Sequence, residues 1–479
     1  MSGAGLHELG ALALRRALAA GECTALDAAE GFLERIAALD AGARGLGAFA
    51  AVTAEAARQR AAALDAARAA GPAAAAARDP RRAPLWGVPF ADKDLVDRAG
   101  APAARGSLAL AGRVPDESSP LARRMDAAGG VSLGKTSTPE FGLVACAGGP
   151  FGVVRNPWRR DRDPGGSSSG AAVAVAARLL PCAPGSDGGG SVRIPAAACG
   201  VLGIKPSRGH PCGVGQTDGA GGLSVPGALA RTAADSALLL AGMSGRPAPG
   251  PLAPPGRLRL AWSCWSPWRQ TVPELRTGEE ELRVLAEAVG LLERLGHRME
   301  PAPDPAVPGF AAAFRTVWET GAALAAATAP RPELLEPFTR RLAEAGSRHA
   351  PEARVAAFAT LERCRRELVE RFRDYDAVLT PVLAGPPWPA GAHGELLAQE
   401  GFERQCRLTP FTAWANVAGL PAVSMPIGER TDGSGLPIGV QAVGRLGSEG
   451  LLLRLAAQLE RELRWDLRVP PEAEGRAVK

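Results

Sequence analysis

The chain has few aromatic residues and no long apolar run. Phe, Trp and Tyr make up 5% of its 479 residues, and tyrosine occurs once, so the rows of stacking rings expected of a single-strand nucleic-acid binder are missing. No stretch approaches the roughly eighteen uninterrupted apolar residues that a membrane span requires. These two shortages predict a protein without a nucleic-acid or membrane partner.

Blocks of one charge sign are also missing. The 55 basic and 50 acidic residues are interleaved, and the net charge is only +5. The eight cysteines form no CxxC pair, and Arg15 and Arg16 interrupt the apolar N-terminal run, which therefore does not resemble a secretory signal. We expect reduced thiols, a cytoplasmic location, no metal site and no cofactor.

Hydrophobic residues form 46% of the chain, which is ample for a large core. Residues 1–84 predict an N-terminal helical segment built from two or three Ala-rich helices. Residues 85–245 alternate short apolar runs with Gly, Pro and Ser clusters, a pattern typical of an α/β sheet with buried strands.

The C-terminal part, residues 257–469, alternates in the same way. Further strands are predicted at 258–262, 376–384 and 422–428, and amphipathic helices at 279–296 and 451–465. The Pro-rich segment 247–256 fits a surface loop as well as a domain boundary. We predict one domain over residues 1–479, in which 85–245 is the core and 257–469 completes the sheet and the pocket.

Two Gly/Ser loops lie between residues 163 and 206. The first, GGSSS at 165–169, leads into the apolar helix AAVAVAA, and the second, SDGGGS at 186–191, places three glycines before a serine. Consecutive glycines let backbone N–H groups turn towards one point, as a developing oxyanion requires. A flexible linker is the alternative interpretation, but apolar segments flank both loops closely and leave no room for an extended spacer.

Both loops resemble the amidase signature family. The matching stretches are GGSSSG and SDGGGSVRIPAAACGVLGIKPSRG, and LWGVPFADKDLVD resembles the strand that carries the family's catalytic lysine. The two key serines, Ser167 and Ser191, stand 24 positions apart, as the family pattern requires. Further matches are TPEFG, RNPW, DAVLTP and AGLPAVSMPIG, so the resemblance covers most of the chain. It looks nearer to the free-standing amidases, a group that includes 6-aminohexanoate cyclic dimer hydrolases.

The resemblance implies a fold and a catalytic set. The fold is α/β/α, with a large mixed central sheet covered by helices on both faces. Ser191 would be the nucleophile, Ser167 a bridging serine after a cis Gly166–Ser167 peptide bond, and Lys93 the base. The oxyanion hole would be formed by the N–H groups of the glycine run and its serine, which are Gly188, Gly189, Gly190 and Ser191, with Ser168 in support.

The chemistry of the residues agrees with this assignment. A serine needs a base to remove its proton, and none of the five histidines lies in a context typical of a nucleophile's partner. A lysine can be that base if it is uncharged, and the apolar GVPFA before Lys93 favours the neutral form. Asp92 and Asp94 should point away from the Lys93 face of an extended segment. Asp187 and Arg193 bracket the second loop and are expected to pair, either to brace it or as a solvated surface pair.

We therefore predict an amidase that hydrolyses a small linear or cyclic carboxylic amide, other than a peptide bond, through an acyl-enzyme on Ser191. The substrate is its expected partner, and a homodimer is one of the oligomeric states left open. The main alternative is the glutamine-hydrolysing subunit of an amidotransferase. A catalytically silent scaffold is a further alternative, which the intact Lys93, Ser167 and Ser191 set argues against.

Other signals fit less well. The segment GGVSLGKT, from Gly129 to Thr136, matches the phosphate-binding P-loop expression, but it follows a predicted helix and contains a predicted strand. Cys199 lies in an apolar run typical of a buried thiol. Pro184 predicts a short or irregular strand before the second loop, and the Gly-rich stretch 210–222 is interpreted as a gate at the site mouth.

Overall fold

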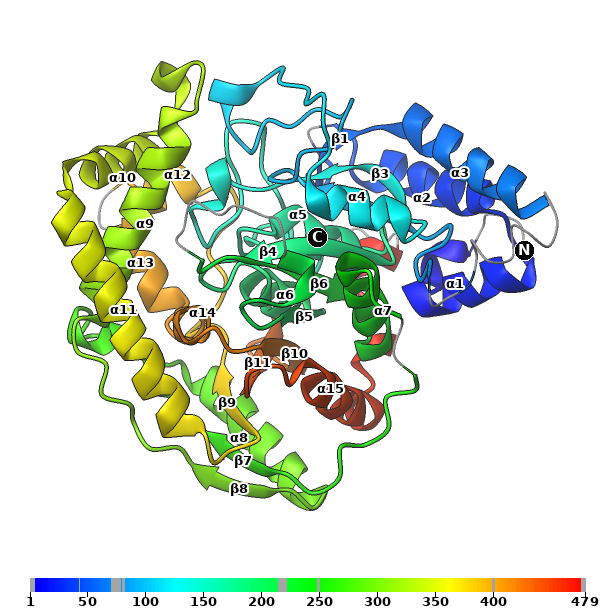
Figure 1. Cartoon of the computed structure of the whole chain (residues 1–479). Helices are drawn as coiled ribbons and strands as arrows, with labels where there is room; N and C mark the ends of the chain where they lie inside the picture. The colour runs from blue at the N-terminus through cyan, green and yellow to red at the C-terminus, as the bar shows by residue number, and fades with distance from the viewer. Residues whose placement is uncertain are drawn as a thin grey trace.

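The structure is a computed structural model that describes residues 5–42, 44–69, 79, 82–213, 222–247, 250–398 and 401–474. Its strands form two sheets (Figure 1): an eight-stranded mixed sheet in the order β4-β6-β5-β10-β11-β9-β7-β8, and a three-stranded sheet in the order β1-β3-β2. The large mixed sheet was predicted. The small sheet was not, and it carries Lys93.

The strands of the large sheet come from both the predicted core and the C-terminal part. They are β4 (Cys182–Asp187), β5 (Leu202–Lys205), β6 (Val225–Ala230), β7 (Arg259–Trp262), β8 (Arg298–Pro301), β9 (Ala377–Pro381), β10 (Ala422–Glu429) and β11 (Pro437–Gly444). β7 runs parallel to β8 and β9, whereas the pairs from β9 to β4 are antiparallel. The strands predicted at 258–262, 376–384 and 422–428 correspond to β7, β9 and β10.

Helices cover both faces of this sheet. Along β11 the side chains alternate, so Gly439 and Gln441 face α6 (Arg193–Cys199), while Gly444 packs on Leu452 of α15 (Glu449–Leu463). On the face of α15 lie α7 (Ala233–Ser244) and α8 (Glu279–Arg294), and on the face of α6 lies α14 (Ala413–Ala418). The α/β/α arrangement is therefore confirmed.

The N-terminal segment contains α1 (Ala11–Ala20), α2 (Ala25–Leu39) and α3 (Ala54–Ala69). Helix α2 begins with a capping box, in which the Thr24 hydroxyl accepts from the Asp27 N–H and the Asp27 carboxylate from the Thr24 N–H. Between α2 and α3 the chain forms the strand β1 (Phe49–Val52), which sequence analysis missed.

The GGVSLGKT segment is not a phosphate-binding loop. Helix α4 (Pro120–Ala127) ends before it, and Val131–Thr136 forms the strand β3 between β1 and β2 (Pro89–Lys93). The ammonium group of Lys135 is fully buried and donates to the Val96 carbonyl. A P-loop requires a free loop that opens a helix, so the nucleotide-binding alternative is wrong.

The strand before the second loop is more regular than predicted. β4 pairs with β6 over all six of its residues without a bulge, and Pro184 lies opposite Ala228. Because β4 is the edge strand of its sheet, a residue without an N–H group is tolerated there. The prediction of a short or irregular strand was therefore wrong.

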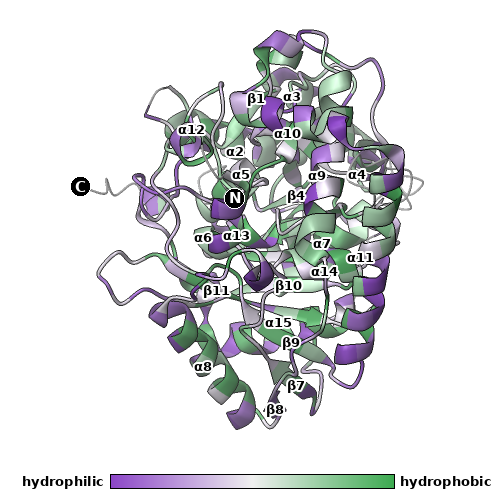
Figure 2. Ribbon diagram, turned by 90° about the vertical axis from the view of Figure 1, so that its left-hand side faces the viewer, coloured by the Kyte–Doolittle hydropathy of each residue, from purple (hydrophilic) through white to green (hydrophobic). Residues whose placement is uncertain are grey.

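Helix α5 (Ser169–Ala176) lies at the centre of the molecule and packs against β4 and β6 (Figure 1). The remaining helices gather beside the sheet at the left of Figure 1 and are α9 (Phe310–Ala327), α10 (Pro337–Arg348), α11 (Pro351–Phe372), α12 (His393–Leu396) and α13 (Gly401–Leu408). Figure 2 shows hydrophilic residues along the outer side of α11, while its buried residues face α9 and α14. Within the described residues, no helix has the length and apolar character needed to cross a membrane.

Candidate active site

Lys93 is the last residue of β2, and its side chain is enclosed by protein. Its Nζ lies 2.8 Å from Ser167 Oγ and 3.0 Å from Ser186 Oγ. Burial lowers the pKa of Lys93 to about 7, and the negative charge of Asp187 opposes this shift only in part. Near neutral pH a large fraction of this amine is therefore uncharged and able to accept a proton.

The two aspartates beside Lys93 point elsewhere, as expected for an extended segment. Asp92 pairs with Arg98 at 2.6 Å, and Asp94 accepts a hydrogen bond from the Gly106 N–H at 3.0 Å. Among the described residues, no carboxylate forms an ion pair with Lys93. Its amine is thus free of the partner that would keep it charged.

The first Gly/Ser loop brings Ser167 to this amine. The peptide bond between Gly166 and Ser167 is cis, as the resemblance implied. The N–H of Ser168 donates to the carbonyl of Ser191 at 3.0 Å, and its hydroxyl lies 3.3 Å from both the N–H and the carbonyl of Ser186. Ser168 therefore connects the two loops.

The second loop is held by a fully buried ion pair. Arg193 donates to Asp187 through both Nε and Nη2, at 3.0 and 2.9 Å, and neither side chain is exposed to solvent. Burial alone would raise the pKa of Asp187, but Arg193, Lys205 and Asn416 hold it well below its usual range. The pair braces the loop, and the alternative of a solvated surface pair is wrong.

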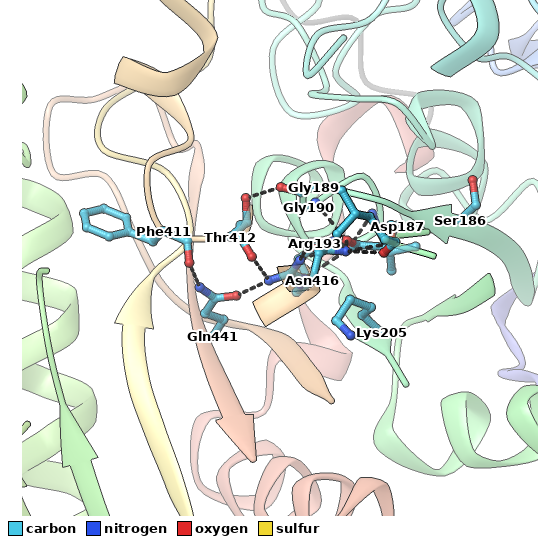
Figure 3. A network of polar contacts seen from close by, with 12 residues as sticks. Ser186, Asp187, Gly189, Gly190, Arg193, Lys205, Phe411, Thr412, Asn416 and Gln441 are labelled. Carbon is cyan, nitrogen blue, oxygen red and sulfur yellow. Dashed lines mark hydrogen bonds and ion pairs between the residues drawn. The ribbon is translucent and has the colours of Figure 1, made fainter. Parts of the chain in front are cut away.

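Figure 3 shows how this pair extends to the next elements. Arg193 also donates to Gln441 of β11 at 2.8 Å and to Asn416 of α14 at 2.7 Å, and Asn416 in turn donates to Asp187 at 2.9 Å. The Thr412 hydroxyl donates to the Gly189 carbonyl at 2.5 Å. The loop is therefore fixed from three directions, by α6, α14 and β11.

The N–H groups of the glycine run are used unequally. The Gly190 N–H donates to the Asp187 carboxylate at 2.8 Å, so the structure removes it from the predicted set of oxyanion donors. In the described part of the chain, the N–H groups of Gly188, Gly189 and Ser191 have no hydrogen-bond acceptor. They are the donors that remain for a ligand oxygen.

Ser167 and Ser191 open into the same cleft. A cavity of about 400 Å³ is lined by both serines, by Gly188 and by Ser186. Lys93 lies behind Ser167 at the base of this cleft, and Lys93 is only 1% exposed. A substrate in this cleft would meet the serines but not the amine.

Sequence analysis missed several residues of this site. Ser186, the first residue of SDGGGS, is the second neighbour of the Lys93 amine, and its place at the end of a strand facing the loop was an available signal. Thr412, Asn416 and Gln441 lie more than 200 positions from Arg193 and carry no local motif.

Further predictions concern the cysteines and the stretch 210–222. Cys199 is fully buried in α6, and burial raises the pKa of its thiol well above the ordinary value, so it remains protonated. All eight cysteines are free, and the described residues contain no cluster of His, Cys, Asp or Glu able to hold a metal ion. Most of the stretch 210–222, the predicted gate, lies outside the described residues.

Comparison with known proteins assigns the family. The profile described as Amidase matches residues 27–453. A Mycobacterium bovis protein named "Putative amidase AmiB2" is 39% identical over 478 residues, covering 96% of this chain and 97% of that protein.

Two solved structures share the fold. The 6-aminohexanoate cyclic dimer hydrolase complexed with substrate has a TM-score of 0.85 at 27% identity and covers 98% of this chain and 99% of its own. The peptide amidase of Stenotrophomonas maltophilia has a TM-score of 0.78 at 28% identity, covering 97% of this chain and 98% of its own. The chain therefore belongs to the amidase signature family and is a hydrolase that acts on carbon–nitrogen bonds.

Proposed function

We propose that the chain hydrolyses a small carboxylic amide through an acyl-enzyme on Ser191, with Ser167 as proton relay and neutral Lys93 as base. One observation carries this proposal: a buried amine with a pKa of about 7 lies 2.8 Å from Ser167 Oγ, and Ser167 shares its cleft with Ser191. A lysine in this state is able to accept a proton near neutral pH.

The reaction has two halves. Ser191 Oγ attacks the amide carbon while its proton passes through Ser167 to Lys93. The carbonyl oxygen becomes an oxyanion that accepts hydrogen bonds from the N–H groups of Gly188, Gly189 and Ser191, each typically worth about 3 kcal/mol. Lys93, now charged, returns the proton through Ser167 to the amine nitrogen, and the C–N bond breaks. Water then attacks the ester by the reverse path and releases the acid.

The network around Asp187 contributes by holding these donors still. Because Gly190 is tied to Asp187 and the Gly189 carbonyl to Thr412, the neighbouring N–H groups need little reorganisation when charge develops. Catalysis of this kind depends on donors that are oriented before the reaction starts.

The test uses the isolated chain and a panel of aliphatic, aryl and cyclic amides. We expect turnover by the wild type, loss of turnover in Ser191→Ala, and trapping of the acyl group by hydroxylamine as a hydroxamate. Cys199→Ala is the matched control, because its thiol is buried away from the cleft and should not be needed. Undiminished turnover in Ser191→Ala would remove Ser191 from the mechanism.

The same assay separates the amidotransferase alternative. A free-standing amidase hydrolyses simple amides without a second protein. If the purified chain were silent on every simple amide and hydrolysed glutamine only with a partner subunit present, the glutaminase function would be favoured.

A further inference from the structure

A second, smaller pocket meets the catalytic cleft at Ser191. Its volume is about 60 Å³, and it is lined by Gly189, Ser191 and the aromatic side chains of Trp268, Phe314 and Phe402. The larger cleft contains Ser167 as well as Ser191, whereas the small pocket contains Ser191 without Ser167. The two spaces therefore lie on different sides of Ser191, and only the larger one gives access to the Ser167 hydroxyl.

Trp318 and Leu143 separate the two spaces, since both residues line each of them. The Trp318 indole N–H donates to the Leu143 carbonyl at 3.0 Å, and its ring stacks on Phe314 with centroids 5.4 Å apart. The partition is thus fixed by a hydrogen bond on one side and an aromatic contact on the other.

The path of the proton decides which half of the substrate lies on which side. In the proposed mechanism the departing nitrogen receives its proton from Ser167, so the amine half must lie next to Ser167, in the larger cleft. The acyl half stays bonded to Ser191 and must extend in another direction. Beside Ser191 and the donor Gly189, that direction is the small aromatic pocket.

The lining of the small pocket has no charged side chain. Among the described residues its buried Trp268 indole N–H has no hydrogen-bond partner, whereas the side chains of Gln405 and Thr409 are bonded to protein. The Gln405 amide oxygen accepts from the Ala145 N–H at 2.7 Å, and its nitrogen donates to the Gly401 carbonyl at 2.9 Å. The Thr409 hydroxyl donates to the Gln405 carbonyl at 2.9 Å. A charged group placed there would lose its hydration and would meet no side chain of opposite charge.

Its size sets a further limit. A dry apolar cavity of about 150 Å³ holds a benzene ring. The pocket beside Ser191, at about 60 Å³, is too small for a ring but has room for a few methylene groups. The larger cleft, at about 400 Å³, falls in the range of ordinary small-molecule sites.

From these contacts we infer that the enzyme selects amides with a short, uncharged aliphatic acyl group, held in the pocket of Trp268, Phe314 and Phe402, and accepts much larger groups on the amine side. This inference rests on the proposed function and adds the substrate class to it. Phe402 and Phe314 are its specificity-determining residues.

The test measures kcat/KM for primary amides, in which the leaving group is ammonia and the acyl group alone varies. The series consists of acetamide, propionamide, butyramide, hexanamide and benzamide. Turnover is measured as the release of ammonia. We expect the optimum between two and four carbons and a fall of at least about tenfold for hexanamide and benzamide, because one methylene too many in an apolar pocket costs about 10- to 200-fold. Butyranilide should remain a substrate.

Phe402→Ala is the variant that enlarges the small pocket, and Phe402 is only half-buried, so the fold should tolerate the change. It should move the optimum towards hexanamide and benzamide. Phe314→Leu, a milder change, should move it in the same direction. Leu95→Ala is the matched control, since Leu95 lines only the larger cleft, and it should alter the ratio of butyranilide to butyramide while the order of the acyl series stays the same.

The outcomes are distinguishable. A wild-type preference for benzamide or hexanamide, or a shift of the acyl order by Leu95→Ala rather than by Phe402→Ala, would overturn the inference while leaving the amidase proposal intact. Absence of turnover on every amide tested would overturn both.

Discussion

The amine of Lys93 makes the proposed reaction pH-dependent. Below its pKa of about 7 the group is an ammonium ion and is unable to take the proton from Ser167. We therefore expect kcat/KM to rise with pH through a midpoint near 7 and to level off above it. The measurement is a profile of kcat/KM between pH 5 and 9. A flat profile would contradict the assignment of Lys93 as base.

Replacing the amine separates catalysis from folding. Lys93→Met should lower kcat by about 10²- to 10⁴-fold, the usual contribution of a general base. The same change should raise stability at pH 6. Folding lowers the pKa of Lys93 from 10.5 to about 7, so a protonated Lys93 reduces the free energy of unfolding. This cost is fully present below pH 7, where the amine is charged in both states, and it disappears as the pH rises towards 10.5. A variant that is inactive and has a lower Tm at pH 6 would contradict this prediction.

Gly190 has a position that only glycine fills. Its φ is +131°, and a Cβ atom there would lie 2.4 Å from Thr412 Oγ1 and 2.7 Å from Ile194 Cδ1. Gly190→Ala should therefore displace the loop and reduce kcat/KM by about 10²-fold or more, the scale of a lost oxyanion donor. Kinetics and thermal unfolding of the variant provide the measurement.

Gly188→Ala is the control for this change. A Cβ atom at Gly188 would make only ordinary contacts, at 3.5 Å, with Ser224 and Trp318. The variant should have the same Tm as the wild type. If Gly190→Ala proved as active as the wild type, the argument that Asp187 and Thr412 fix the donors would fail.

At the residue scale, sequence patterns predicted the groups that need a particular chemistry. Lys93, Ser167 and Ser191 lie in motifs whose composition is restricted over many positions, and the structure brings Lys93 to Ser167 and places both serines in one cleft. The engagement of the Gly190 N–H by Asp187 was not predictable, because a run of glycines does not reveal which N–H group turns inward.

The buried pair at the start of α6 is expected to dominate the stability of the site. Arg193 makes hydrogen bonds to Asp187, Gln441 and Asn416, and Arg193→Met would leave the Asp187 carboxylate buried without its charge partner. Removing one partner of such a buried pair lowers the free energy of unfolding by about 3–5 kcal/mol. We expect urea unfolding of the variant to show a loss of this size together with loss of activity.

Arg159→Met is the matched control at the surface. Arg159 pairs with Asp161 at 3.1 Å, but both side chains are partly exposed, at 34% and 56%. Such pairs contribute about 0–1 kcal/mol. Equal losses in the two variants would show that the Arg193 network has no special role in stability.

Strand β1 shows why some elements escape prediction. FAAV, at Phe49–Val52, is only four residues long and lies among alanines that favour helix, so its sequence alone carries no strand signal. It becomes a strand because it pairs with β3. In contrast, β7, β9 and β10 are apolar runs between turn residues and were predictable from that pattern.

At the scale of the whole molecule, partly buried hydrogen bonds connect segments that lie far apart in the sequence. The Asp235 carboxylate at the start of α7 accepts from the Leu12 N–H at 2.7 Å, and Arg231 donates to the Leu9 carbonyl at 2.6 Å. Arg35 of α2 donates to the carbonyls of Ala177 and Ala473. These pairs connect residues up to 438 positions apart, and no sequence motif predicted any of them.

The N-terminal segment should therefore unfold together with the active site. β1 pairs with β3, β3 pairs with β2, and β2 ends at Lys93, so opening the segment exposes one side of the sheet that holds the base. We expect the loss of activity in urea to coincide with the rise of hydrogen exchange in α1, β1 and β11, measured by mass spectrometry on the same samples. A segment 1–84 that exchanged freely at a urea concentration where activity was intact would be a separate domain. Coincident transitions would instead favour one cooperative unit over residues 1–479, because exposure of Leu12, Phe49 and Lys93 would then be a single event.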